Sequence, residues 1–244
     1  MICDLFIRSY WKDLDWLRFC LESIETYCHG FRAVVVVLPE SSRAAVQRRA
    51  PWRGVRTEWC RDYHDDYLGQ QATKLLADLY TDADLICHVD SDCIFQRRTC
   101  PSDLMRDGRP RIVRLSNERL SKRHPWRAST EKFLKWPVPY DFMRRPPFVY
   151  PRNLYSAVRT HALSVHGVDI ETYITAQPVR GFSEFNVLGA LAWAHHRDDF
   201  AWIDDDETIE EPCCRWFWSW GGLDASTRHE IQQILRAPAP GGAG

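Results

Sequence analysis

The sequence predicts an α/β fold with a mostly parallel sheet flanked by helices, and three observations support this prediction. Strand-like runs at 3–9, 32–39 and 84–90 alternate with stretches whose apolar residues recur at helical spacing. The run at 33–38 is apolar throughout, as in a parallel strand that helices cover on both faces. With 244 residues, 45% of them hydrophobic, the chain is long enough for one such domain or one and a half.

The first half of the chain has the pattern of successive strand–helix units. Apolar, β-branched and aromatic residues at 3–9 predict the first strand. Asp13 then has the position of a helix N-cap, and Gly30 that of a helix end. The other elements expected here are a helix at 41–49, a strand at 55–60, a helix at 70–80 with Leu75, Leu76 and Leu79 facing inward, and the strand at 84–90.

The pattern changes after Phe95, where regular alternation ends. Residues 137–151 are rich in Pro and aromatic side chains, and Ser183 has the position of a helix cap. The segment 237–244 contains only Pro, Ala and Gly, so we expect a disordered tail. The elements expected in this half are a strand at 111–116 and helices at 126–136, 183–195 and 226–235.

Charge is unevenly distributed along the chain. The formal net charge is -1, yet residues 106–159 hold fourteen Lys and Arg against four Asp and Glu, a local net charge of +10. A solvated basic face would account for this excess. Attraction to an anion, such as a diphosphate, a phosphorylated acceptor or an anionic membrane surface, would account for it equally well.

The nine cysteines are odd in number and include no CxxC pair. We therefore expect reduced thiols and no structural zinc site. No basic segment followed by an apolar stretch and a cleavage site opens the sequence, which favours a cytoplasmic location. The longest apolar run, 33–38, is far shorter than the roughly 20 residues that span a bilayer, so we expect no spanning helix.

The most specific chemical signal is Asp90-Ser91-Asp92, which follows the strand predicted at 84–90. Two carboxylates at a strand end can hold Mg²⁺ or Mn²⁺, which prefer oxygen ligands and share them with phosphates. Such a metal would neutralise the charge on a departing nucleoside diphosphate. A polar turn with two solvated acids is the plain alternative.

Three segments together resemble the successive motifs of GT-A glycosyltransferases. They are DLFIRSY at 4–10, GQQATKL at 69–75 and HVDSD at 88–92. The likeness covers about the first hundred residues. The chain is similar to a family of small bacterial proteins with a QQxxKL … DxD signature and more loosely resembles small viral glycosyltransferase domains. Arg8 departs from the pattern, because the wider superfamily often has Pro or another small residue there.

The resemblance implies a GT-A, Rossmann-like fold and a metal-dependent donor site. Residues 1–100 would bind the nucleotide sugar, and residues 101–236 would form the acceptor half of the same domain. A UDP-sugar is the favoured donor and Mn²⁺ or Mg²⁺ the favoured cofactor. Asp90 and Asp92 would hold the metal. The donor-binding residues would be Ser9 and Tyr10 at the base, Gln71, Lys74 at the diphosphate, Asp90, and Trp220, Gly221 and Gly222 in a C-terminal loop that closes over the donor.

An inverting transfer also needs a base for the acceptor proton, and Glu184 is the candidate. It lies in the first turn of the helix predicted at 183–195, three residues after Gly181. Inverting GT-A enzymes are similar in placing an acidic base at such a helix start. The alternative is a carboxylate that only stabilises the helix N-terminus, worth about 0.3–1 kcal/mol.

The sequence therefore favours an inverting glycosyltransferase that moves a sugar to an acceptor hydroxyl. The acceptor would be a glycan or a lipid-linked sugar, with an anionic one as an option. Contact with a membrane surface fits the basic segment, whereas no nucleic-acid partner is expected. The alternatives left open are a non-catalytic carbohydrate-binding protein, with tryptophans stacking on sugars, and a metal-dependent phosphatase or nucleotidyltransferase.

Overall fold

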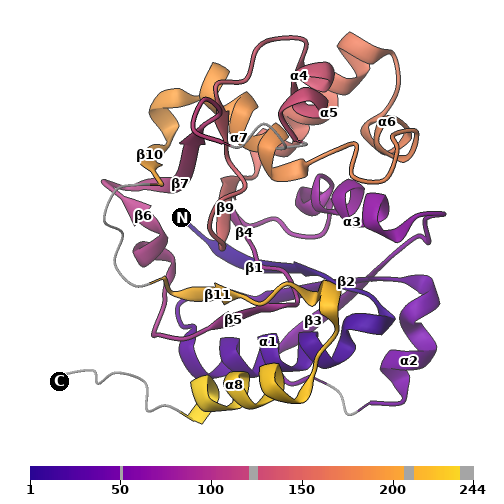
Figure 1. The fold of residues 1–244 in the computed structure, drawn as a ribbon, viewed down its shortest axis with the longest axis vertical. Helices are drawn as coiled ribbons and strands as arrows, with labels where there is room; N and C mark the ends of the chain where they lie inside the picture. The colour runs from indigo at the N-terminus through magenta and orange to yellow at the C-terminus, as the bar shows by residue number, and fades with distance from the viewer. Residues whose placement is uncertain (50–51, 121–125, 206–211, 237–244) are drawn as a thin grey trace.

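The computed structural model describes residues 1–49, 52–120, 126–205 and 212–236. A five-stranded sheet lies between two groups of helices (Figure 1). Its strand order is β3-β2-β1-β4-β9, with β9 alone antiparallel to its neighbour. The fold is thus mixed α/β with a mostly parallel central sheet, as predicted. The strands are β1 (Cys3–Arg8), β2 (Val34–Pro39), β3 (Val55–Cys60), β4 (Leu85–His88) and β9 (Phe148–Pro151).

Side chains of the central strands alternate between two apolar cores. Phe6 packs into the core under α3, α5 and α7, while Leu5 and Ile7 pack into the core under α1. All three are fully buried, as expected for a strand covered on both faces. The helices are α1 (Leu14–Tyr27), α2 (Arg43–Gln47), α3 (Asp66–Lys74), α4 (Trp126–Leu134), α5 (Asn153–His166), α6 (Ile170–Thr175), α7 (Glu184–His195) and α8 (Ala225–Arg236).

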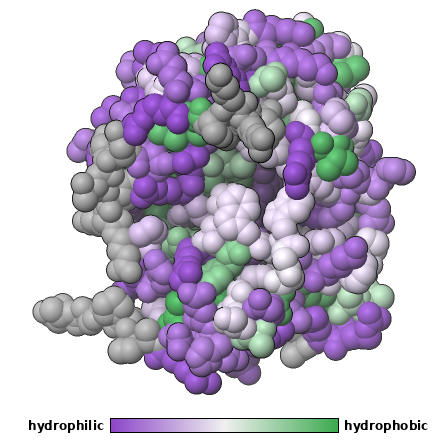
Figure 2. All heavy atoms as spheres, viewed as in Figure 1, coloured by the Kyte–Doolittle hydropathy of each residue, from purple (hydrophilic) through white to green (hydrophobic). Residues whose placement is uncertain are grey.

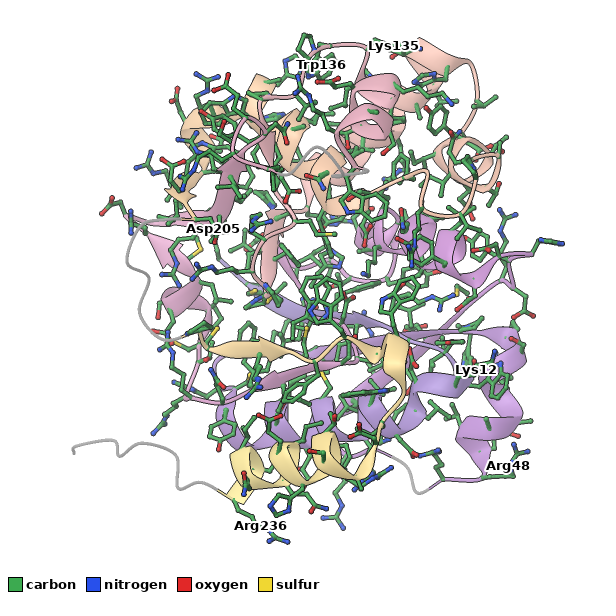
Figure 3. All side chains as sticks on the ribbon, in the orientation of Figure 1. Lys12, Arg48, Lys135, Trp136, Asp205 and Arg236 are labelled. Atoms are coloured by element: carbon green, nitrogen blue, oxygen red, sulfur yellow. The ribbon has the colours of Figure 1, made fainter. Side chains whose placement is uncertain are left out.

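Shorter strands extend this framework on the face shown in Figure 1. β11 pairs with β5 in antiparallel fashion, so the C-terminal part of the chain returns to the end of β4. Asp205, directly after β10, receives hydrogen bonds from Arg144 (2.9 Å) and Arg145 (2.7 Å) and lies at an edge of the molecule (Figure 3). The strands are β5 (Cys93–Phe95), β6 (Met105–Arg106), β7 (Arg109–Ser116), β8 (Tyr140–Asp141), β10 (Ala201–Asp204) and β11 (Cys214–Trp216).

One local prediction was wrong. Leu79 is 67% exposed rather than inward, because α3 ends at Lys74 and a 3₁₀ turn, Ala77–Leu79, changes the direction of the chain. Asp13 has the N-cap position of α1, as predicted, but its side chain makes no capping hydrogen bond. The sequence analysis also missed α5, α6 and β9. The segment 237–244 lies outside the described residues, and none of the described helices is long and apolar enough to cross a bilayer.

Gly189 permits α7 to approach the chain at Phe142. A Cβ on residue 189 would overlap the Phe142 side chain, which is fully buried and cannot move aside easily. We therefore expect Gly189→Ala to lower the free energy of unfolding by about 1–3 kcal/mol, the usual cost of overpacking a core. Urea denaturation followed by tryptophan fluorescence measures this. The control is Gly54→Ala. A Cβ on residue 54 would meet no atom within 4 Å, but Gly54 has φ +67, so any loss of stability in this variant comes from backbone strain alone.

Candidate functional site

A cavity of about 840 Å³ lies at the carboxyl ends of β1 and β4. In parallel sheets, loops that follow neighbouring strands meet at this edge and form ligand sites. Figure 2 shows a hollow near the centre of one face, bordered by pale side chains of intermediate hydropathy. Its walls come from the segment after β1, from α3, from the segment after β4, from the start of α7 and from the segment after β11.

Asp90 and Asp92 both line this cavity, as the sequence predicted. Asp92 is 6% exposed, and burial together with the nearby Asp90 carboxylate raises its pKa to about 6. One Asp92 carboxylate oxygen accepts a hydrogen bond from the Ser219 backbone N–H at 2.7 Å. The other, Oδ1, is buried without a partner among the described residues. An unsatisfied buried carboxylate oxygen is costly, so this atom is ready to accept a ligand.

Asp13 adds a third carboxylate to this wall. Burial and the charges of Asp92, Asp66 and Asp90 raise the pKa of Asp13 to about 7. The sequence analysis assigned Asp13 to helix capping and therefore missed it. Its position directly before a buried helix gave no sign that it would face Asp92.

Lys74 joins two of the predicted residues into one cluster. Its Nζ lies 2.6 Å from an oxygen of Asp90 and 2.9 Å from an oxygen of Glu184. The ammonium also lies 4.7 Å from the centre of the Phe185 ring. Burial lowers the pKa of Lys74, but the two carboxylates more than reverse this and raise it above its usual value. Lys74 therefore stays protonated and cannot itself accept a proton.

Glu184 begins α7 and is 4% exposed. The Ser183 side chain does not cap the helix, because its hydroxyl accepts a hydrogen bond from the Asn186 amide at 3.1 Å. Glu184 faces the cavity from the second half of the chain, whereas Asp90 faces it from the first half. The shared contact with Lys74 brings these two carboxylates to the same part of the cavity.

Arg8 holds the segment after β1 in place. This arginine is 1% exposed, forms an ion pair with Asp66, and donates a 2.9 Å hydrogen bond to the Ser9 carbonyl. Ser9 and Tyr10 line the cavity, and the Ser9 hydroxyl is buried without a partner among the described residues. Arg8, the departure from the expected pattern, thus holds this segment in place through a buried ion pair.

The helix α3 presents Tyr67, Gln71 and Lys74 to the cavity, at intervals of four and three residues. Gln70 also lines it, but Gln71 is the more buried of the two, and the side-chain Oε1 of Gln71 has no partner among the described residues. Asp66 and Tyr67 were missed by the sequence analysis. The spacing from Tyr67 to Lys74 was the signal that could have found Tyr67.

The segment after β11 closes one side of the cavity. The Phe217 N–H donates to the Asp92 carbonyl at 3.0 Å, which ties this segment to the Asp-x-Asp turn. Trp220 lines the cavity and is 63% exposed, with its ring edge-to-face against Tyr67 at 5.9 Å. Gly221 and Gly222 follow directly but are not among the lining residues; Gly222 has φ +76, which a glycine adopts without strain.

Asp90 and Asp92 are the described lining residues that could hold a divalent cation. Five carboxylates and three cationic side chains give the cavity a formal excess of two negative charges. Asp90 and Asp92 offer the oxygen ligands that Mg²⁺ and Mn²⁺ prefer. The described residues contain no group of three or more His, Cys, Asp and Glu side chains arranged to hold a metal. Remaining ligands would then come from water or phosphate, as is usual for Mg²⁺.

Comparison of the chain with models of known protein families and with curated proteins finds no match in either set.

Proposed function

We propose that this chain is an inverting GT-A glycosyltransferase that transfers a sugar from a nucleoside-diphosphate sugar, preferably a UDP-sugar, to an acceptor hydroxyl. The observation that supports it best is the cluster of Asp90, Lys74 and Glu184, with contacts of 2.6 and 2.9 Å. A candidate metal ligand and a candidate base, from opposite halves of the chain, meet in one cavity of a size suited to a ligand of this kind.

In this proposal Asp90 and Asp92 hold the metal, which supplies charge neutralisation at the leaving diphosphate. Ser9 and Gln71 orient the nucleotide through polar atoms that have no partner among the described residues. Tyr10, which also lines the cavity, borders the base. Lys74 keeps Glu184 at a fixed distance from Asp90. Glu184 accepts the proton of the acceptor hydroxyl as the new bond forms. The acceptor, a glycan or a lipid-linked sugar, enters beside Trp126 and Phe182, which also line the cavity.

A carbohydrate-binding protein without catalysis is the second candidate, because Trp218 and Trp220 are 56% and 63% exposed beside the cavity. It requires no buried carboxylates. The proposed transferase requires a metal and the carbohydrate-binding protein does not, so one experiment on metal dependence distinguishes the two functions.

We expect UDP with Mn²⁺ to stabilise the protein against heat, since a ligand that binds only the native state at 100 times its Kd adds about 2.7 kcal/mol. Asp92→Asn should remove this stabilisation, because it deletes a metal-binding charge while keeping an acceptor for the Ser219 N–H. Differential scanning fluorimetry measures the shift. Asp198→Asn, an exposed carboxylate outside the cavity, is the control. Equal stabilisation by UDP in EDTA would contradict the proposal.

A further inference from the structure

Three cationic side chains line the cavity in the described part of the chain, and two of them are already paired. Arg8 is paired with Asp66, and Lys74 with Asp90 and Glu184. Arg180 also lines the cavity, yet no carboxylate of the described residues lies within ion-pair distance of it. It is therefore the cation that remains for a ligand.

Arg180 is held beside the opening by an aromatic contact. Its guanidinium lies 4.6 Å from the centre of the Trp220 ring, and Trp220 in turn contacts Tyr67 on α3. A cation over a ring keeps its N–H donors free, since the ring attracts its charge and takes up none of its hydrogen-bonding positions. The segment after β11 and the turn before α7 thus meet at Arg180.

The backbone at this position is constrained. Arg180 has φ +63, a left-handed conformation that is uncommon outside glycine, asparagine and aspartate. The turn is closed by the Gly181 N–H, which donates to the Pro178 carbonyl at 2.7 Å. A Cβ at residue 181 would overlap that same carbonyl, so the glycine is required. An arginine kept at a costly backbone position beside a cavity points to a use for its side chain.

We propose that Arg180, stacked against Trp220, binds a phosphate group of the ligand. A guanidinium presents two parallel N–H donors that match two phosphate oxygens. The cavity otherwise carries excess negative charge, so a phosphate needs a cation beyond those already paired. The phosphate is either the diphosphate of the donor or a phosphate on the acceptor. This assignment rests on the proposed function, and it specifies phosphate as the group that binds at the opening of the cavity.

The test compares Arg180→Asn with the wild type by calorimetry, using UDP with Mn²⁺. Asparagine tolerates the left-handed backbone, so the charge is removed without new strain. Arg197→Asn is a matched control, because Arg197 lies over Trp193 at 3.8 Å and does not line the cavity. If Arg180 holds the donor diphosphate, Arg180→Asn should bind UDP at least tenfold more weakly, and Arg197→Asn should bind it as the wild type does.

A second titration separates the two phosphate sources. Inorganic phosphate is added to protein saturated with UDP and Mn²⁺, as a probe of an acceptor phosphate. If Arg180→Asn binds UDP as the wild type does but binds inorganic phosphate tenfold more weakly, Arg180 holds the phosphate of the acceptor. No change with either probe overturns the proposal. If the wild type does not bind UDP, the proposed glycosyltransferase function fails. The phosphate-binding role of Arg180 is then tested by titrating inorganic pyrophosphate into the wild type and Arg180→Asn. Equal binding of pyrophosphate by the two proteins refutes that role.

Discussion

Lys74→Met is expected to lower the free energy of unfolding by about 3–5 kcal/mol, the usual cost of removing one partner from a buried ion pair. Lys74 is 3% exposed and neutralises both Asp90 and Glu184. Methionine keeps most of the volume of the lysine side chain. The loss of stability therefore reports the cost of leaving the Asp90 and Glu184 carboxylates buried without their cation. Chemical denaturation followed by the fluorescence of the eleven tryptophans gives the free energy.

Two further variants distinguish the charge effect from a packing effect. Lys132→Met removes an exposed lysine that donates a hydrogen bond to the Gln177 side chain, and should change stability by less than about 0.5 kcal/mol. The double variant Lys74→Met with Glu184→Gln removes one of the two stranded charges, and should recover part of the loss. A loss below about 1 kcal/mol in Lys74→Met, or no recovery in the double variant, would contradict the role of the cluster.

The layered fold could be predicted because its signals are local. The apolar run that became β2 and the helical spacing in α1 depend only on neighbouring residues. The prediction failed where tertiary packing decides the outcome. Leu79 is exposed because the chain turns after α3, and this turn does not follow from periodicity.

The candidate site was predictable in part. Asp90 and Asp92 follow β4 directly, so their place at the sheet edge follows from the strand itself. The contact between Lys74 and Glu184 joins residues 110 positions apart and has no sequence signal. Arg180 was missed for a related reason, since an arginine in a polar turn resembles any surface arginine until Trp220 is placed beside it.

Glu184→Gln is expected to reduce the transfer rate by about 10²–10⁴-fold, the range that a positioned acid–base group contributes. Glutamine preserves the shape of the side chain and can still contact its neighbours, but it cannot take a proton from an acceptor hydroxyl. Because Asp90 and Asp92 are untouched, UDP binding with Mn²⁺ should stay within about twofold of the wild type. Release of UDP from a UDP-sugar, with water or an added sugar as acceptor, measures the rate.

Two observations bear on the base and on the stereochemistry separately. Glu230→Gln changes a half-buried carboxylate on α8 that is paired with Arg215 outside the cavity, and should leave the rate unchanged. Proton NMR of the first-formed product reports its anomeric configuration, which a single displacement assisted by Glu184 must invert. A product that retains the donor configuration would exclude Glu184 as the base of an inverting transfer, even if the variant were slow. A variant that keeps full activity would exclude Glu184 as the base whatever the configuration of the product.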